Sequence, residues 1–121
     1  MLTEQISMKT PAGTTLQLDN DLYDDGYLHI EYNKYYAVCD NRPLYHLTRK
    51  ELLILFCLAR AAGRPVAGLE IWIEVWGEVE YKIKTLRVYI ANLRRKLAPH
   101  GLTVTSTTSA EYCLARTVAD R

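Results

Sequence analysis

The apolar positions of this chain follow two different periods, which divide it into strand-like and helix-like parts. Leu28 and Ile30 alternate with other residues inside the segment 27–32, as expected for a half-buried strand. In the segment 82–97 the apolar residues instead recur at helical spacing, at Leu86, Ile90, Leu93 and Leu97. Both periods in one chain predict an α+β protein.

The N-terminal part is predicted to contain a small antiparallel strand meander. Aromatic and β-branched residues concentrate in residues 27–32 and 35–39, which favours two strands. Residues 40–43 (DNRP) are predicted to form a turn, and residues 44–47 a short return strand. Residues 1–20 are mostly polar, with weak periodicity, and are predicted to form a linker or arm.

Capping and stop signals predict two helices in the middle of the chain. Thr48 and Glu51 have the spacing of a capping box, in which each side chain bonds the other residue's amide. The apolar segment 52–62 follows, and Gly63 is expected to close this first helix. A second helix is expected over residues 68–76. Its predicted buried residues are Ile71, Trp72, Val75 and Trp76.

The order of the predicted elements defines the fold class. A loop over residues 78–83 leads to a helix that ends before Pro99, and residues 102–107 and 112–115 form a hairpin candidate. A strand meander, three helices and a terminal β-hairpin make a winged helix-turn-helix, whose third helix enters the DNA groove. The predicted organisation is a linker or arm over residues 1–20, a winged-helix DNA-binding domain over residues 21–117 and a tail over residues 118–121.

The third predicted helix carries the strongest chemical signal. The segment 82–97 contains six Lys or Arg residues and no acid. The side opposite its apolar stripe holds basic and small residues, namely Lys84, Val88, Ala91 and Arg95, with Arg87 and Asn92 on the flanks. Small residues let a helix approach the major groove closely, and Arg and Asn can bond base edges. Taken alone, the same pattern also fits a solvated surface helix.

Charge is segregated along the chain although the formal net charge is only +1. Residues 1–40 hold seven acids and two bases, residues 41–81 five of each, and residues 82–121 eight bases and two acids. The C-terminal part is therefore predicted to meet a polyanion. No apolar run has the length of a membrane span and no signal peptide is evident, so a cytoplasmic protein without membrane contact is expected.

Enzymatic and metal chemistry find little support in the residue pattern. Three cysteines without CxxC spacing favour buried, reduced thiols. The three histidines lack ligand-like spacing, and no Gly-rich phosphate loop or nucleophile elbow occurs. The chain is thus not expected to be an enzyme, and neither a metal nor a cofactor is expected.

Several short motifs, in this order, resemble the winged-helix effector domain of OmpR/PhoB-class bacterial response regulators, over about residues 22–115. The first motifs are DDGYLHI at residues 24–30, LTxxE at 47–51 and GRxV at 63–66. They are followed by VWG at 75–77, TLRVYIxxLRxKL at 85–97 and Tyr112. This resemblance implies sequence-specific binding of double-stranded DNA and control of transcription, in a two-component system.

The resemblance also implies the DNA-binding residues. The expected readers of base edges are Arg87, Val88 and Asn92, and the expected backbone-contacting or helix-fixing residues are Lys84, Thr85, Tyr89, Arg94 and Arg95. The wing departs from the family pattern, because Glu111 and small residues replace its usual Arg and Gly-x-Gly. Weak wing contacts are therefore expected, from Thr107 and Thr108 in particular.

Three further expectations concern partners. The loop 78–83, with Glu78 and Glu80, is either a contact for RNA polymerase, as in the family, or a plain connector. Few cationic contacts favour a homodimer on repeated half-sites. The alternative function is a winged-helix module specialised for protein–protein interaction, with an exposed apolar patch of Leu53, Phe56, Leu69 and Ile73. The target sequence, the sign of regulation, phosphorylation control and the presence of a receiver domain stay open.

Overall fold

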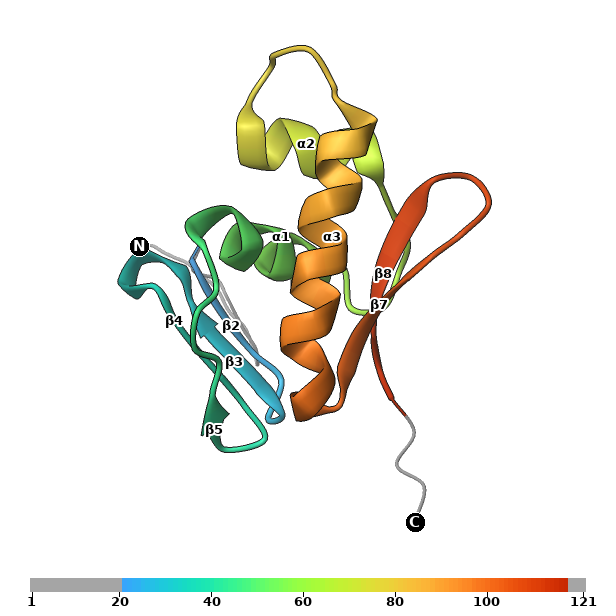
Figure 1. Ribbon diagram of the computed structural model, residues 1–121. Helices are drawn as coiled ribbons and strands as arrows, with labels where there is room; N and C mark the ends of the chain where they lie inside the picture. Colours follow the sequence, from blue (N-terminus) through green and yellow to red (C-terminus); the bar gives the residue numbers. More distant parts are fainter. Residues whose placement is uncertain (1–20, 118–121) are drawn as a thin grey trace, which may run out of the picture. The chain divides into compact units, whose positions relative to one another are not determined.

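A computed structural model describes residues 21–117, which fall into two compact units that divide between Pro43 and Leu44 (Figure 1). The predicted arm over residues 1–20 and the predicted tail over residues 118–121 lie outside the described residues. Within residues 21–117, no helix combines the length and the hydropathy needed to cross a bilayer.

The first unit is the predicted antiparallel meander. Its strand order is β2-β3-β4-β5, with strands β2 (Leu22–Asp24), β3 (Leu28–Glu31), β4 (Tyr36–Cys39) and β5 (Arg42–Pro43) and the 3₁₀ turn η1 (Tyr32–Lys34). The register places Leu28 opposite Cys39 and Ile30 opposite Ala37, and all four side chains are buried. The two-residue period therefore gives one apolar face, as predicted.

The predicted return strand over residues 44–47 is wrong. Asp40 and Asn41 alone form the turn, with φ of 55° and 63°, so the chain reverses two residues earlier than expected. The return strand is consequently Arg42–Pro43, opposite Cys39 and Val38. Pro43 lacks an amide hydrogen and fits only such an edge strand. His46, with φ of 67°, then interrupts any extended run after it.

The other face of the meander carries a charged cluster around His29. The register sets Asp24 directly opposite His29, and Glu31 follows two residues later on the same face. His29 Nδ1 lies 3.1 Å from Asp24 Oδ2, and His29 Nε2 lies 2.8 Å from Glu31 Oε2. The bond to Glu31 raises the pKa of His29, aided by Asp24, and the bond to His29 lowers the pKa of Glu31. Lys34 and Tyr36 also lie beside these groups.

The second unit contains the helices and the hairpin. Its elements are α1 (Arg49–Arg60), β6 (Val66–Ala67), α2 (Gly68–Trp76), α3 (Ile83–Leu97), η2 (Ala98–His100), β7 (Leu102–Ser106) and β8 (Glu111–Arg116). The hairpin β7–β8 forms a three-stranded sheet with the short strand β6, which pairs with β8 through Val66 opposite Tyr112. The predicted α+β winged helix-turn-helix is confirmed.

The predicted capping box is present at the start of α1. Thr48 Oγ1 accepts from the Glu51 amide at 3.1 Å, and Glu51 Oε1 accepts from the Thr48 amide at 2.9 Å. Lys96 Nζ, from the last turn of α3, lies 2.7 Å from the same Oε1 and donates to the His46 carbonyl at 2.6 Å. Glu51 is only 2% exposed, so this carboxylate joins the start of α1 to the end of α3. The position of Lys96 along the chain gives no local indication of this role.

The predicted burial in α1 and α2 is partly correct. Ile71 and Trp72 are buried, whereas Val75 and Trp76 are only half-buried. Phe56 is buried against the Arg60 guanidinium, 4.7 Å from its ring centroid, and Leu53 is half-buried. The proposed exposed patch therefore shrinks to two residues of α2, Leu69 and Ile73.

The His29 cluster makes the stability of the meander depend on pH. Because the folded pKa of His29 is raised, its contribution is fully present below the unfolded pKa and is lost as the pH rises through the folded value. Because the folded pKa of Glu31 is lowered, its contribution is fully present above the unfolded pKa and is lost as the pH falls through the folded value. An NMR titration should therefore give a His29 pKa above about 6.5. The substitution Glu31→Gln should lower it, and an unchanged value would contradict the cluster.

The substitution Lys96→Ala should destabilise the second unit by about 1–3 kcal/mol, because it removes a donor from a buried carboxylate. Urea unfolding measures the free energy. Lys84→Ala is the matched control, because Lys84 is exposed on the same helix and should change stability by less than about 0.5 kcal/mol. Equal effects of the two substitutions would show that the contact with Glu51 contributes nothing.

Candidate nucleic-acid interface

Helix α3 separates an apolar stripe from a basic face. Its four buried residues are those of the predicted stripe, Leu86, Ile90, Leu93 and Leu97. Lys84, Arg87, Val88 and Arg95 are exposed, and Val88 is 57% exposed although it is apolar. More than half of the Val88 side chain is therefore available to an external surface.

Two of the predicted residues hold α3 in place. Arg94 Nε donates to the Val104 carbonyl of β7 at 2.8 Å. Tyr89 packs edge-on against Trp76 of α2, with ring centroids 5.1 Å apart. Arg94 and Tyr89 are both half-buried. Of the two roles considered for Arg94, the geometry favours fixing the helix.

The predicted reader Asn92 is engaged within its own helix. Arg95 Nη2 donates to Asn92 Oδ1, and Asn92 is half-buried. Its amide nitrogen remains the group available to a base acceptor, while Arg95 is held over the same turn. Thr85 is also half-buried and lines a hollow with Trp72 and Trp76 beside the first turn of α3.

The wing is a hydroxyl-rich turn without a cation. Thr107 Oγ1 accepts from the Ser109 and Glu111 amides at 3.1 and 3.3 Å, and its own amide donates to the Glu111 carbonyl. Ala110 adopts a φ of 61° to close the turn. Thr107 therefore shapes the turn, and its hydroxyl hydrogen remains a donor, whereas Thr108 is exposed at the tip.

The wing, α2 and the α2–α3 loop meet at Gly68. The Gly68 amide donates to the Ala110 carbonyl at 3.1 Å, and a Cβ on Gly68 would lie 2.4 Å from Tyr81 Oη. A larger residue here would require the Tyr81 hydroxyl group to move. Burial, with a smaller effect of Tyr112, raises the pKa of Tyr81. Tyr81 was not predicted to belong to this region, because nothing in its spacing shows that a residue of this loop contacts the start of α2.

The loop between α2 and α3 is anchored by aromatic contacts. Trp72 Nε1 donates to the Val79 carbonyl at 3.1 Å, and Trp72 stacks on Trp76 with ring centroids 4.1 Å apart. The Val79 side chain is nevertheless 60% exposed, between exposed Glu78 and Glu80. Within residues 21–117, no three metal-ligating side chains cluster.

A family model and a curated protein match this chain. The model described as "Transcriptional regulatory protein, C terminal" matches residues 41–114. The DNA-binding dual master transcriptional regulator RpaA of Synechocystis sp. is 39% identical over 72 residues, covering 56% of this chain. The match covers 30% of RpaA, so the chain spans less than a third of that protein.

Solved structures share the fold at low sequence identity. The RstA DNA-binding domain of Klebsiella pneumoniae, crystallised with the RstA box, is 21% identical with a TM-score of 0.65, covering 79% of this chain and 98% of that one. The DNA-binding domain of CpxR from E. coli is 22% identical with a TM-score of 0.66, covering 82% and 100%. These likenesses establish the winged-helix fold.

The substitutions Arg94→Ala and Arg87→Ala should have different effects on the free energy of unfolding, because Arg94 fixes the helix and Arg87 lies on its exposed face. Arg94→Ala leaves the buried Val104 residue without its side-chain donor and should cost about 1–3 kcal/mol of unfolding free energy. Arg87→Ala, on the exposed face, should change it by less than about 0.5 kcal/mol. Thermal unfolding followed by circular dichroism measures both, and similar values would contradict the assignment of Arg94.

Proposed function

The chain belongs to the family formed by the C-terminal winged-helix domains of OmpR/PhoB-class transcriptional regulators, and we propose that it binds double-stranded DNA sequence-specifically to regulate transcription. The family is one of DNA-binding regulators and not of enzymes. The observation that carries the proposal is the exposed face of α3, on which Lys84, Arg87, Val88 and Arg95 are all exposed. A buried stripe holds the helix on the opposite side.

In this proposal α3 enters the major groove, where some of its residues contact base edges and others contact the DNA backbone. Arg87 bonds a guanine edge, and Val88 contacts a thymine methyl group. Asn92 presents its amide nitrogen to a base acceptor while its oxygen positions Arg95. Lys84 and Arg95 contact phosphates, and Thr85 supports the backbone contact at the first turn. Tyr89 and Arg94 act by keeping α3 at the angle that the core sets.

The wing contributes little to this binding. Its tip offers hydroxyl donors from Thr107 and Thr108, and half-buried Glu111 repels phosphates. With about four or five phosphates neutralised, counterion release gives a log–log salt slope near −4. The affinity of one domain is therefore modest, and α3 supplies most of it.

Further partners belong to the same proposal. The exposed side chains of Glu78, Val79 and Glu80, on a loop that Trp72 anchors, fit a contact with RNA polymerase. Modest affinity for one half-site favours a homodimer on repeated half-sites. A cytoplasmic location is consistent with binding to chromosomal DNA.

The test selects duplexes from a random pool and then measures binding to one half-site. Arg87→Ala should weaken binding by about 1–3 kcal/mol and relax the preference at one base pair. Lys84→Ala should weaken all sequences alike and reduce the salt slope by about one. Arg64→Ala is the control, because Arg64 is an exposed cation on the α1–α2 side of the unit and should leave half-site binding unchanged. Failure to enrich any duplex would refute the proposed function.

A further inference from the structure

The side chain of Tyr81 reaches from the loop between α2 and α3 to the start of α2. Its ring packs against Trp72, with ring centroids 5.6 Å apart. A Cβ atom on Gly68 would lie 2.4 Å from Tyr81 Oη, 3.2 Å from a methyl carbon of Leu86 in the first turn of α3 and 3.4 Å from the Ala110 carbonyl oxygen of the wing. The hydroxyl group therefore lies where the loop, α2, α3 and the wing come together.

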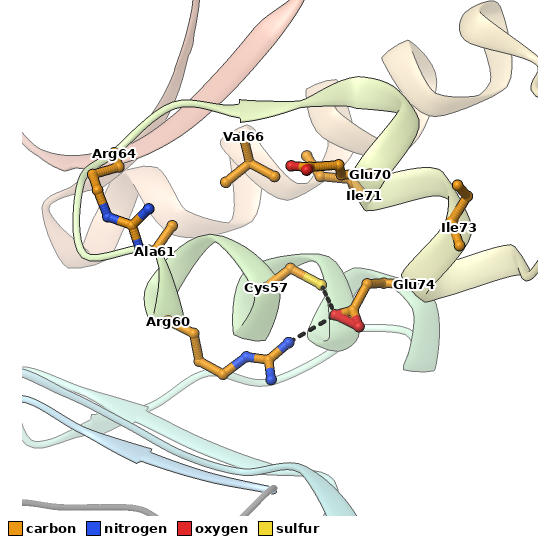
Figure 2. A pocket seen from close by; sticks show the side chains of 9 residues that line it. All are labelled: Cys57, Arg60, Ala61, Arg64, Val66, Glu70, Ile71, Ile73 and Glu74. Carbon is orange, nitrogen blue, oxygen red and sulfur yellow. Dashed lines mark hydrogen bonds and ion pairs between the residues drawn. The ribbon is translucent and has the colours of Figure 1, made fainter.

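Hydrogen bonds hold α2 against the wing and against α1. The Gly68 amide donates to the Ala110 carbonyl at 3.1 Å, which joins the start of α2 to the wing. Farther along α2, Glu74 Oε1 accepts from Arg60 Nη2 at 2.7 Å and from Cys57 Sγ at 3.1 Å, both from α1 (Figure 2). The fold thus sets the position of α2, against which the hydroxyl group rests.

The hydroxyl group of Tyr81 is a donor that the domain does not use. It forms no hydrogen bond with any of the residues 21–117. The residue is half-buried, and its oxygen remains accessible to solvent. Burial first, and Tyr112 next, raise the pKa of Tyr81, while Arg87 opposes this shift. The group therefore keeps its hydrogen at neutral pH and can donate to an acceptor outside the domain.

The surroundings of this hydroxyl group favour an acceptor on the DNA backbone. Leu86 directly precedes Arg87, the proposed reader of a guanine edge, so the group lies between the first turn of the reading helix and the wing. Tyrosine hydroxyl groups are among the usual phosphate contacts of DNA-binding proteins. Glu111 follows Ala110, but side chains alternate along a strand, so Glu111 points away from the face of buried Tyr112.

We propose that the Tyr81 hydroxyl group donates to a phosphate oxygen of the DNA, at the edge of the groove that α3 enters. Tyr81 is then a further DNA-contacting residue, which lies on the loop and not on α3 or the wing. The absence of a side chain at Gly68 leaves the space that the hydroxyl group needs. The contact rests on the proposed function, because it forms only when α3 is bound to a duplex.

The substitution Tyr81→Phe keeps the ring that packs on Trp72 and removes only the hydroxyl group. It should weaken binding to the selected half-site about three- to tenfold, and equally for all sequences, because a phosphate contact carries no sequence information. The salt slope should not change, since a neutral donor releases no counterion, in contrast to Lys84→Ala. Tyr45→Phe is the matched control, because Tyr45 is 70% exposed and belongs to neither α3, the loop nor the wing.

A methylphosphonate scan of the half-site tests the contact itself. Each duplex carries one neutral methylphosphonate in place of a phosphate, and each is titrated by fluorescence anisotropy with wild-type protein, Tyr81→Phe and Tyr45→Phe. At the contacted phosphate the loss of affinity should be about three- to tenfold smaller for Tyr81→Phe than for the wild type. At all other phosphates the two proteins should lose affinity equally, and Tyr45→Phe should follow the wild type throughout.

The outcomes separate this contact from the proposed function. Equal affinities of wild type and Tyr81→Phe, equal losses at every phosphate, or a loss confined to one base-pair preference would overturn the phosphate contact alone. Thermal unfolding of Tyr81→Phe should match that of the wild type, and a clear loss of stability would overturn the contact by revealing an acceptor within the domain. If the wild type binds no duplex, the proposed function fails and the phosphate contact fails with it.

Discussion

The carboxylate of Glu51 holds together the two helices that matter most for function. One oxygen accepts from the Thr48 amide, which starts α1, and from the Lys96 ammonium, which ends α3. Because the side chain is almost fully buried, both donors are needed to offset the loss of water around its charge. The direction of α3 relative to α1 therefore depends on a contact whose partners lie 45 residues apart.

The basic residues of α3 serve two different purposes. Lys96 and Arg94 bond groups inside the domain, at the Glu51 carboxylate and the Val104 carbonyl. Lys84, Arg87 and Arg95 project from the opposite side of the helix and remain available to a polyanion. A count of cations along the segment overstates the charge offered to DNA, because the cations nearest the core stabilise the fold.

The proposed contacts leave different sides of the second unit for different partners. The α3 face suits DNA, and the loop held by Trp72 presents the exposed side chain of Val79. Gly68 links this loop to the wing, because its neighbours are Tyr81 from the loop and Ala110 from the wing. A shift of the loop would therefore displace the wing directly, because Gly68 packs closely against both.

Local signals in the amino-acid sequence were enough to predict several elements of the fold. The capping box of α1, the apolar stripe of α3 and the apolar alternation of β3 were all predictable, since each depends on residues within one or two turns or along one strand. The return strand was misplaced because residues 40–43 were all predicted as turn, whereas two positive φ angles at Asp40 and Asn41 close the turn by themselves. The partners of the charged side chains, in contrast, follow from the tertiary structure. Lys96 pairs with Glu51 and Arg60 pairs with Glu74, whereas Arg94 bonds the Val104 carbonyl. Arg64 and Glu70 are exposed. Such pairing depends on how helices that are distant in sequence pack together. The spacing of apolar residues within one helix carries no information about that packing.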